Sequence, residues 1–308
     1  MNSPQKGTLL VLITALSSGI AIFLNKYALA SFSDAVLFTL LKNAAVAVAL
    51  GALLLGLSQH KTFRNLSRND WLQLLGIGIL GGGIAFAIYF GALQSAQALT
   101  AGLLHKTLFL WTAILGVFAL REKLDKPFLA AITLLFVGNY LIFQTAFSFG
   151  LPEALILLAV LLWSIENFLA KRLMNANPRV NGTHVGFARM FFGAVFLLGL
   201  LAASGHAGEL ATLSLAHFEW IAITAGFLLV YVFTYYNGLQ RIPLHHAAAL
   251  LSLGQPVTAI LVLAFAGKTP APLEAMGLLL IVLATGIISY TLLMRASGAR
   301  PTTLADLA

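Results

Sequence analysis

A lysine and a histidine lie side by side near the middle of a long apolar stretch, GLLHKTLFLWTAIL at 102–115. An ammonium at the centre of a membrane-spanning helix costs roughly 2.5–3.5 kcal/mol on insertion scales. A chain that keeps Lys106 there is expected to use it, because an ammonium can bind a carboxylate or pair with a buried acid. His105 beside it can carry a proton.

An acid and a large ring stand in a second apolar stretch, LLWSIENFLAKR at 161–172. Trp163, Glu166 and Asn167 are three and four residues apart, so they cover one broad face of a helix. Glu166 and Lys106 are predicted to neutralise each other as a buried pair. The sequence leaves open whether that pair is purely structural or receives the two charged ends of a ligand.

Aromatic residues follow one stripe of a third stretch, GFLLVYVFTYYNGL at 226–239, where Phe227, Tyr231 and Tyr235 recur every four residues. Such a stripe serves either helix packing or the binding of a flat ring, and both interpretations stay open. A tyrosine hydroxyl within a bilayer needs a partner, which adds weight to ligand binding.

The composition identifies the environment of these residues. Of 308 residues, 60% are hydrophobic and 9% charged, and the mean hydropathy is +0.94. A soluble domain carries about 25% charged residues, so this is an integral membrane protein. The absence of cysteine excludes disulfides and thiolate metal sites.

Enzyme and cofactor motifs are weak or absent. GIGILGGG at 76–83 satisfies the dinucleotide pattern G-x-G-x-x-G, but no strand precedes it. The chain has no Walker motif for ATP hydrolysis. We expect no enzyme activity, cofactor or metal, because the histidines near the membrane surfaces do not form H-E-x-x-H: His184, His206, His217, His245 and His246.

Ten apolar segments reach the length of about 20 residues that crosses a bilayer. Joined by short loops, they predict an all-α membrane protein, and we number them span 1 to span 10. They lie near 7–30, 34–57, 71–93, 97–119, 127–147, 152–173, 183–203, 218–239, 246–266 and 273–294.

The basic residues are distributed unevenly between the two membrane faces. On the face of the N-terminus, called side A, lie thirteen of the 18: Lys6, Lys61, Arg64, Arg68, Arg121, Lys123, Lys126, Lys171, Arg172, Arg179, Arg241, Arg295 and Arg300. The opposite face, side B, has only Lys26 and Lys268. The positive-inside rule therefore predicts that side A and both termini are cytoplasmic, and the positive charge requires no nucleic-acid partner.

An internal repeat relates the two halves of the chain. YFGALQSAQALTAGLLHKTLFLWTAIL (89–115) aligns without a gap to YYNGLQRIPLHHAAALLSLGQPVTAIL (235–261), with nine identities in 27 positions. FLNKYAL (23–29) corresponds to FLAKRLM (168–174), and Lys42 corresponds to Arg189. The offset covers five spans, so 1–147 and 148–308 are expected to be inverted repeats, which place a binding site near the midplane and support alternating access.

These features resemble the drug/metabolite transporter superfamily, EamA type, and most closely its bacterial exporters of aromatic amino acids. The shared residues are Lys42 and Arg189, REKL (121–124), Gly138, Pro256, Gly277 and Gly286. Departures from the family pattern are Leu110, Arg121 and GKT (267–269). The resemblance implies a secondary transporter of the bacterial inner membrane, with a central cavity lined mainly by spans 1, 3, 4, 6, 8 and 9.

Two stripes that mix small and polar residues are expected to face that cavity. They are Gly102, Lys106, Phe109 and Ala113 in span 4, and Ala248, Ser252, Gln255 and Ala259 in span 9. His105 projects about 100° from Lys106 and faces either the cavity or another helix. Ser18 in span 1 aligns with the much larger Trp163 in span 6, so it is expected to leave space in the cavity. Lys42 and Arg189 are expected to bond carbonyls or helix ends near opposite mouths.

Span 3 carries the small-residue pair Gly78 and Gly82, four apart, which allows close approach of a neighbouring helix. Several glycines together also make a helix easier to bend. We therefore expect span 3 to be a moving part, with Gly78 at the cavity.

The side chains predict a zwitterionic substrate with a flat apolar group. Lys106 is expected to bind its carboxylate, Glu166 or backbone carbonyls its ammonium, and Trp163 with Tyr231 or Tyr235 its ring. An aromatic amino acid has this chemistry, and the alternative is an aromatic cationic drug or another small metabolite. Besides this small molecule and membrane lipid we expect no partner, and we expect the protein to act as a monomer.

The charge asymmetry makes a testable prediction of orientation. Since the chain lacks cysteine, single cysteines can replace Ser67 on side A and Ser204 on side B. In intact cells an impermeant thiol reagent should label the Ser204→Cys variant and leave Ser67→Cys unlabelled until the membrane is permeabilised. Labelling of Ser67→Cys from outside would reverse the topology.

Overall fold

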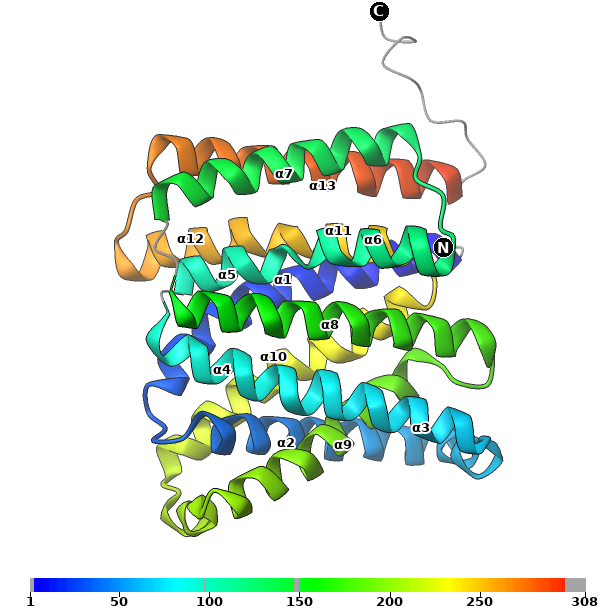
Figure 1. Ribbon diagram of the computed structural model, residues 1–308, viewed down its shortest axis with the longest axis vertical. Helices are drawn as coiled ribbons and strands as arrows, with labels where there is room; N and C mark the ends of the chain where they lie inside the picture. The colour runs from blue at the N-terminus through cyan, green and yellow to red at the C-terminus, as the bar shows by residue number, and fades with distance from the viewer. Residues whose placement is uncertain (1–2, 97, 147–149, 297–308) are drawn as a thin grey trace, which may run out of the picture.

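The structure, a computed structural model, describes residues 3–96, 98–146 and 150–296, and Arg300 and residues 97 and 147 at the predicted boundaries lie outside this part (Figure 1). Its regular elements are all helical, and ten helical segments are long and apolar enough to cross a membrane. Seven spans are single helices: α1 (Ser3–Leu29), α2 (Ala35–Gly56), α7 (Lys126–Ala146), α8 (Leu151–Ala176), α9 (Gly182–Ala203), α10 (Leu215–Leu239) and α13 (Pro272–Ala296).

Spans 3, 4 and 9 are interrupted helices. Span 3 joins α3 (Arg68–Ile77) to α4 (Ala85–Ser95) through a π-helical turn, η2 (Gly78–Ile84). Span 4 consists of α5 (Ala98–Lys106) and α6 (Leu108–Leu120). Span 9 consists of α11 (Leu244–Leu250), a 3₁₀ turn η4 (Leu251–Leu253) and α12 (Gly254–Ala266). Short 3₁₀ turns, η1 (Gln59–Asn65) and η3 (His206–Thr212), lie outside the spans.

The interruptions of spans 4 and 9 lie at equivalent places in the two repeats. In span 9, Pro256 cannot donate to the carbonyl of Ser252, which explains the local change of helix type. Span 4 breaks at Thr107 although Leu110 stands where the proline would be. The backbone there makes three-residue turns, from Thr107 N to Leu104 O and from Leu110 N to Thr107 O.

Helix contacts follow an approximate two-fold relation between the halves. Helix α1 packs on α10 and α12, and its repeat counterpart α8 packs on α4 and α6. Helix α2 packs on its own counterpart α9, and α7 packs on α13. In Figure 1, α1 and α8 run in opposite directions, and α7 and α13 lie together at one edge. The predicted ten-span fold of two inverted repeats is confirmed.

Two lysines repeat the same capping contact in both halves. Lys26 Nζ donates to Leu93 O and Ala96 O, at 2.9 Å each. Its counterpart Lys171 donates to Leu239 O at 2.8 Å and Ile242 O at 2.9 Å. These carbonyls end spans 3 and 8, where a helix has no donors of its own. Each ammonium therefore satisfies a helix end near one membrane face.

Glycines allow span 3 and α9 to cross at backbone contact. A Cβ added at Gly82 would collide with the carbonyl oxygen of Arg189, and one at Gly193 would lie 2.5 Å from the carbonyl carbon of Gly82. A Cβ at Gly78 would collide with Phe192. The predicted close approach along Gly78 and Gly82 is confirmed, whereas motion of span 3 remains a prediction.

Gly82→Ala should therefore destabilise the protein, by about 1–3 kcal/mol as in other overpacked sites. Gly76→Ala is the matched control on the same span, because a Cβ there meets nothing within 4 Å. Thermal unfolding in detergent should show a lower melting temperature for Gly82→Ala and an unchanged or higher one for Gly76→Ala. Equal melting temperatures would contradict the crossing.

Candidate functional site

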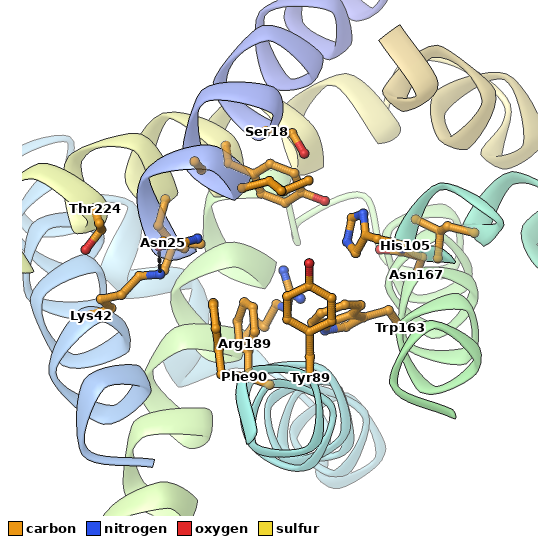
Figure 2. Close-up of a pocket in the computed structure, with 16 residues that line it drawn as sticks. Ser18, Asn25, Lys42, Tyr89, Phe90, His105, Trp163, Asn167, Arg189 and Thr224 are labelled. Carbon is orange, nitrogen blue, oxygen red and sulfur yellow. Dashed lines mark hydrogen bonds between the residues drawn. The ribbon is translucent and has the colours of Figure 1, made fainter. Parts of the chain in front are cut away.

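A cavity lies between the two halves of the described structure (Figure 2). Its empty space is about 660 Å³, including some open solvent. It is lined by Ser18, Ala21, Ile22, Asn25, Lys42, Phe86, Tyr89, Phe90, His105, Leu108, Trp163, Asn167, Arg189, Thr224, Leu228 and Tyr231. Spans 2 and 7 thus contribute to the lining, and span 9, which was expected there, does not.

The cavity reaches from the side B half of the bundle to just past its middle. Asn25 is four residues from the side B end of α1, about 6 Å along the helix. Tyr231 is sixteen residues from the side B end of α10, about 24 Å along a helix of 25 residues. Tyr235 and Tyr236, one turn further toward side A, are buried. The inner end of the cavity is therefore closed by packed aromatic residues.

One wall of the cavity is built around Trp163 on α8. Its ring lies 5.1 Å from Tyr89 and from His105, and 5.3 Å from Phe86, measured between centroids. Its Nε1 donates to Gly81 O at 2.9 Å, which fixes the indole. Figure 2 shows the Tyr89 hydroxyl pointing into the space between these side chains. That hydroxyl and His105 Nδ1 are buried without a hydrogen-bond partner, so both are available to a ligand.

Lys42 brings an ammonium to the side B half of the cavity. Its Nζ donates to Asn25 Oδ1 at 2.7 Å, the dashed line in Figure 2. It also lies over the rings of Phe38 and Phe90, 4.5 and 4.6 Å from their centroids. These partners are all neutral, and among the described residues no carboxylate forms an ion pair with Lys42.

Arg189 brings a guanidinium to the deeper part of the cavity. One of its nitrogens donates to Gly81 O at 3.3 Å, and Nε lies 3.8 Å from Glu166 Oε2. The guanidinium stands over the rings of Phe86 and Tyr236. Glu166 is fully buried, and its other oxygen accepts the Tyr236 hydroxyl at 2.6 Å. Arg189 is thus held against a carboxylate, in contrast to Lys42.

The structure brings five of the predicted site residues to the cavity: Ser18, His105, Trp163, Asn167 and Tyr231. Lys106 lies behind this lining. Its Nζ donates to Ser18 Oγ at 2.9 Å, and it packs beside Gly254 of span 9. The prediction that Lys106 and Glu166 form a pair is wrong, because Lys106 points toward spans 1 and 9 whereas Glu166 faces Arg189 on α9.

The other predicted site residues lie outside the lining. Tyr235 is buried against the ring of Tyr231. Ser252 is buried, Gln255 donates to Asn139 Oδ1 at 3.2 Å beside a second, smaller void, and Gly78 packs on Phe192. Conversely, Lys42 and Arg189 were expected to be architectural and both line the cavity. Each is seven residues from the start of its helix, α2 or α9, and this equivalent position in the two repeats was the signal that could have indicated a shared place at the cavity.

A model of the EamA-like transporter family matches the sequence twice, over residues 5–144 and 151–290. The chain belongs to the EamA-like transporter family. Members are membrane transporters of small metabolites, in agreement with ten apolar spans in this chain. No curated protein matches it. One solved structure, described as a crystal structure of a protein, is 20% identical, covers 95% of this chain and 99% of its own, and has a TM-score of 0.69. That likeness shows the fold alone.

One group of side chains has the composition of a metal site. Asp34, His206 and Glu209, on side B loops of this EamA-like transporter, offer ligand atoms within 4.8 Å of one another. Asp34 already caps α2 through Val36 N and Leu37 N, and its other oxygen lies 2.8 Å from His206 Nδ1. That hydrogen bond raises the pKa of His206. The group is explained as a loop contact between the halves.

On side A, Glu122 ties the end of span 4 to the start of span 9. Its carboxylate accepts Leu244 N at 2.8 Å and His245 N at 3.3 Å, and it lies 2.5 Å from His245 Nδ1. A carboxylate is favoured at such a helix start, where backbone N–H groups lack partners. The equivalent residue on side B is Lys268, which cannot make these contacts. Lys268 therefore does not repeat this tie on side B.

The pKa of Glu122 lies below its usual 4.5: burial, the largest single cause, raises it, but the His245 and backbone hydrogen bonds together outweigh burial. A carboxyl whose pKa is lower in the folded state stabilises folding above its unfolded pKa. That stabilisation is lost as the pH falls through the folded value. The contribution of Glu122 should therefore be full at pH 7 and should be lost progressively as the pH falls below 4.5 and through the folded pKa.

Glu122→Gln should lower the stability at pH 7 by about 1–3 kcal/mol, the cost of weakening hydrogen bonds to a charged acceptor. Melting temperatures of wild type and variant, measured in detergent at a series of pH values from 7 downward, should differ at pH 7 and draw together as the pH falls below 4.5. Glu219→Gln, which changes an exposed acid, is the control. A gap that stays constant with pH would contradict the assigned charge.

Proposed function

We propose that this EamA-like transporter exports amino acids, above all phenylalanine, tyrosine and tryptophan and also other apolar ones, across the bacterial inner membrane by alternating access. The observation that carries the proposal is one cavity, between inverted repeats, that combines an aromatic wall with two basic side chains. The direction of transport follows the family resemblance, the cytoplasmic termini follow the charge distribution, and the monomeric state is part of the proposal.

The aromatic wall supports a ring on the substrate. Phe86, Tyr89, Phe90, Trp163 and Tyr231 line the cavity, and Trp163 is fixed by its hydrogen bond to Gly81 O. Aromatic pairs in tilted or edge-on geometry contribute about 0.5–1.5 kcal/mol beyond the area they bury. A substrate ring inserted among these side chains gains such contacts, whereas an aliphatic side chain gains only burial.

The basic residues support a carboxylate on the substrate. Lys42 is the cation whose partners are all neutral, and His105 and Tyr89 offer further unpaired polar atoms in the same space. A carboxylate bound there receives charge-assisted hydrogen bonds, which are about twice as strong as neutral ones. Lys106, placed behind Ser18, adds positive charge without reaching the cavity itself.

The alternative substrate class, aromatic cationic drugs, is supported by the rings alone. A cation attracted to them by cation–π contact would also meet Lys42 and Arg189, which repel it. Lys42 and Arg189 are among the sixteen described lining residues, and none of these sixteen is acidic. An anionic group on the substrate is therefore favoured over a purely cationic one.

The test is counterflow in proteoliposomes with a panel of radiolabelled amino acids, with and without a pH gradient. Phenylalanine, tyrosine and tryptophan should exchange against an internal aromatic amino acid, and alanine should exchange weakly. Arginine and an aromatic cationic drug should not compete. A transporter that exchanged the drug and ignored the aromatic amino acids would belong to the alternative class.

Tyr231→Leu should reduce the preference for aromatic over aliphatic substrates, because Tyr231 lines the cavity and stacks on Tyr235 at 5.7 Å. The lost ring contact corresponds to about a tenfold change at most. Competition by phenylalanine against leucine in the counterflow assay measures it. Tyr140→Leu, on the exposed face of α7, is the control, and an equal effect of both variants would remove Tyr231 from the binding site.

A further inference from the structure

The cavity offers cations and hydroxyls but no acid. None of the sixteen lining residues is Asp or Glu. Glu166 is the nearest candidate in the sequence, but it is fully buried outside the lining and is held by Tyr236 and Arg189. The ammonium of an amino acid therefore meets no carboxylate here.

Some neutral acceptors for an ammonium are already occupied, while the unpaired Tyr89 hydroxyl and His105 Nδ1 can donate to a carboxylate as well as accept from an ammonium. Asn25 Oδ1 receives the Lys42 ammonium, and Gly81 O receives both Trp163 and Arg189. Lys42, whose partner is the neutral Asn25, shares the cavity with the ligand, and like charges in a medium of low polarity repel strongly. The surroundings of the ligand thus favour a carboxylate and oppose an α-amino group.

Each repeat contributes one basic side chain to the cavity, Lys42 from the first and Arg189 from the second. Lys42 over Phe90 and Arg189 over Tyr236 occupy equivalent positions, so each half supplies a cation stacked on a ring. Only the second half adds an acid: Glu166 stands where the first half has Ala21. Arg189 is therefore compensated inside the protein, and one uncompensated cation, Lys42, remains at the cavity.

We propose that the preferred ligands of this cavity are aromatic monocarboxylates without an amino group, with Lys42 binding the carboxylate and the aromatic wall binding the ring. This rests on the proposed function in that it uses the same cavity. Aromatic amino acids bind through the same two groups and are weaker ligands because their ammonium is unpaired. Glu166 determines the specificity by neutralising Arg189, so that one anionic group, and not two, is accepted.

Three matched compounds test the proposal on the purified full-length protein in nanodiscs at pH 7. They share a phenyl ring and a short chain: 3-phenylpropanoate has only the carboxylate, phenylalanine has both charged groups, and phenethylamine has only the ammonium. Calorimetry or ligand-induced thermal stabilisation should give 3-phenylpropanoate a dissociation constant about tenfold below that of phenylalanine, with no binding of phenethylamine.

Substitutions then assign the charges. Lys42→Met should weaken 3-phenylpropanoate by about tenfold or more, and Lys42→Arg should retain it. Lys268→Met, on an exposed side B loop, is the control and should change nothing. Glu166→Gln keeps an acceptor for Tyr236 and frees Arg189, so phenylsuccinate, an aromatic dicarboxylate, should bind this variant about tenfold better than wild type.

Each outcome separates this proposal from the proposed function. Tighter binding of phenylalanine than of 3-phenylpropanoate by wild type overturns the monocarboxylate proposal and leaves amino-acid transport standing. Binding of 3-phenylpropanoate alone supports the monocarboxylate proposal and overturns amino-acid transport. Absence of binding by both overturns both. Because the wild-type comparison needs no variant, instability of Lys42→Met or Glu166→Gln leaves the proposal falsifiable.

Discussion

Backbone carbonyls of a π-helical turn inside the bilayer determine how the site is built, because buried side chains donate to them. A π-helical turn at Gly78–Ile84 shifts the hydrogen-bond pattern of span 3, and a carbonyl without a donor costs several kcal/mol in hydrocarbon. The donors come from the residues around the cavity. Gly81 O accepts Trp163 and Arg189, and Gly82 O accepts Asn43 at 2.7 Å. Glycines at 81 and 82 keep these oxygens accessible. The wall and the deeper cation are therefore positioned by the same turn that lets α9 cross in backbone contact.

Periodicity and charge predicted the fold because both are properties of continuous helices. Ten spans, their inversion and the pairing of Lys26 with Lys171 could be read from spacing alone, and the structure repeats them in detail. The stripe through Lys106 failed for a physical reason. It assumed one helix from 102 to 113, and the break at Thr107 separates Lys106 from the residues that follow. His105, the preceding residue on α5, lines the cavity in place of Lys106. The partner of Glu166 could not be predicted either, since it depends on which neighbouring helix approaches α8.

The two halves share their architecture and differ in their charges. Equivalent lysines cap equivalent helix ends, and equivalent cations stand on equivalent rings. The acids differ between the two halves: Ala21 occupies the position equivalent to Glu166, and Lys268 occupies the position equivalent to Glu122. A buried acid next to Arg189 leaves Lys42 as the lining cation that forms no ion pair with a described carboxylate, and Glu122 joins the end of span 4 to the start of span 9 on side A. The charge of the cavity lining and the difference between the two faces thus both depend on a few residues that differ between the two repeats.

The lysine caps also limit how the bundle can deform. Lys26 fastens the end of span 1 to the end of span 3 at side B, and Lys171 fastens the end of span 6 to that of span 8 at side A. Each fastening joins two helices of one half at a single face. If a gap opens on side B, the linked ends of spans 1 and 3 must therefore move together away from the second half. If a gap opens on side A, the linked ends of spans 6 and 8 must move together away from the first half. Each half of the molecule therefore has one pair of linked helix ends, and the two links lie on opposite faces of the membrane.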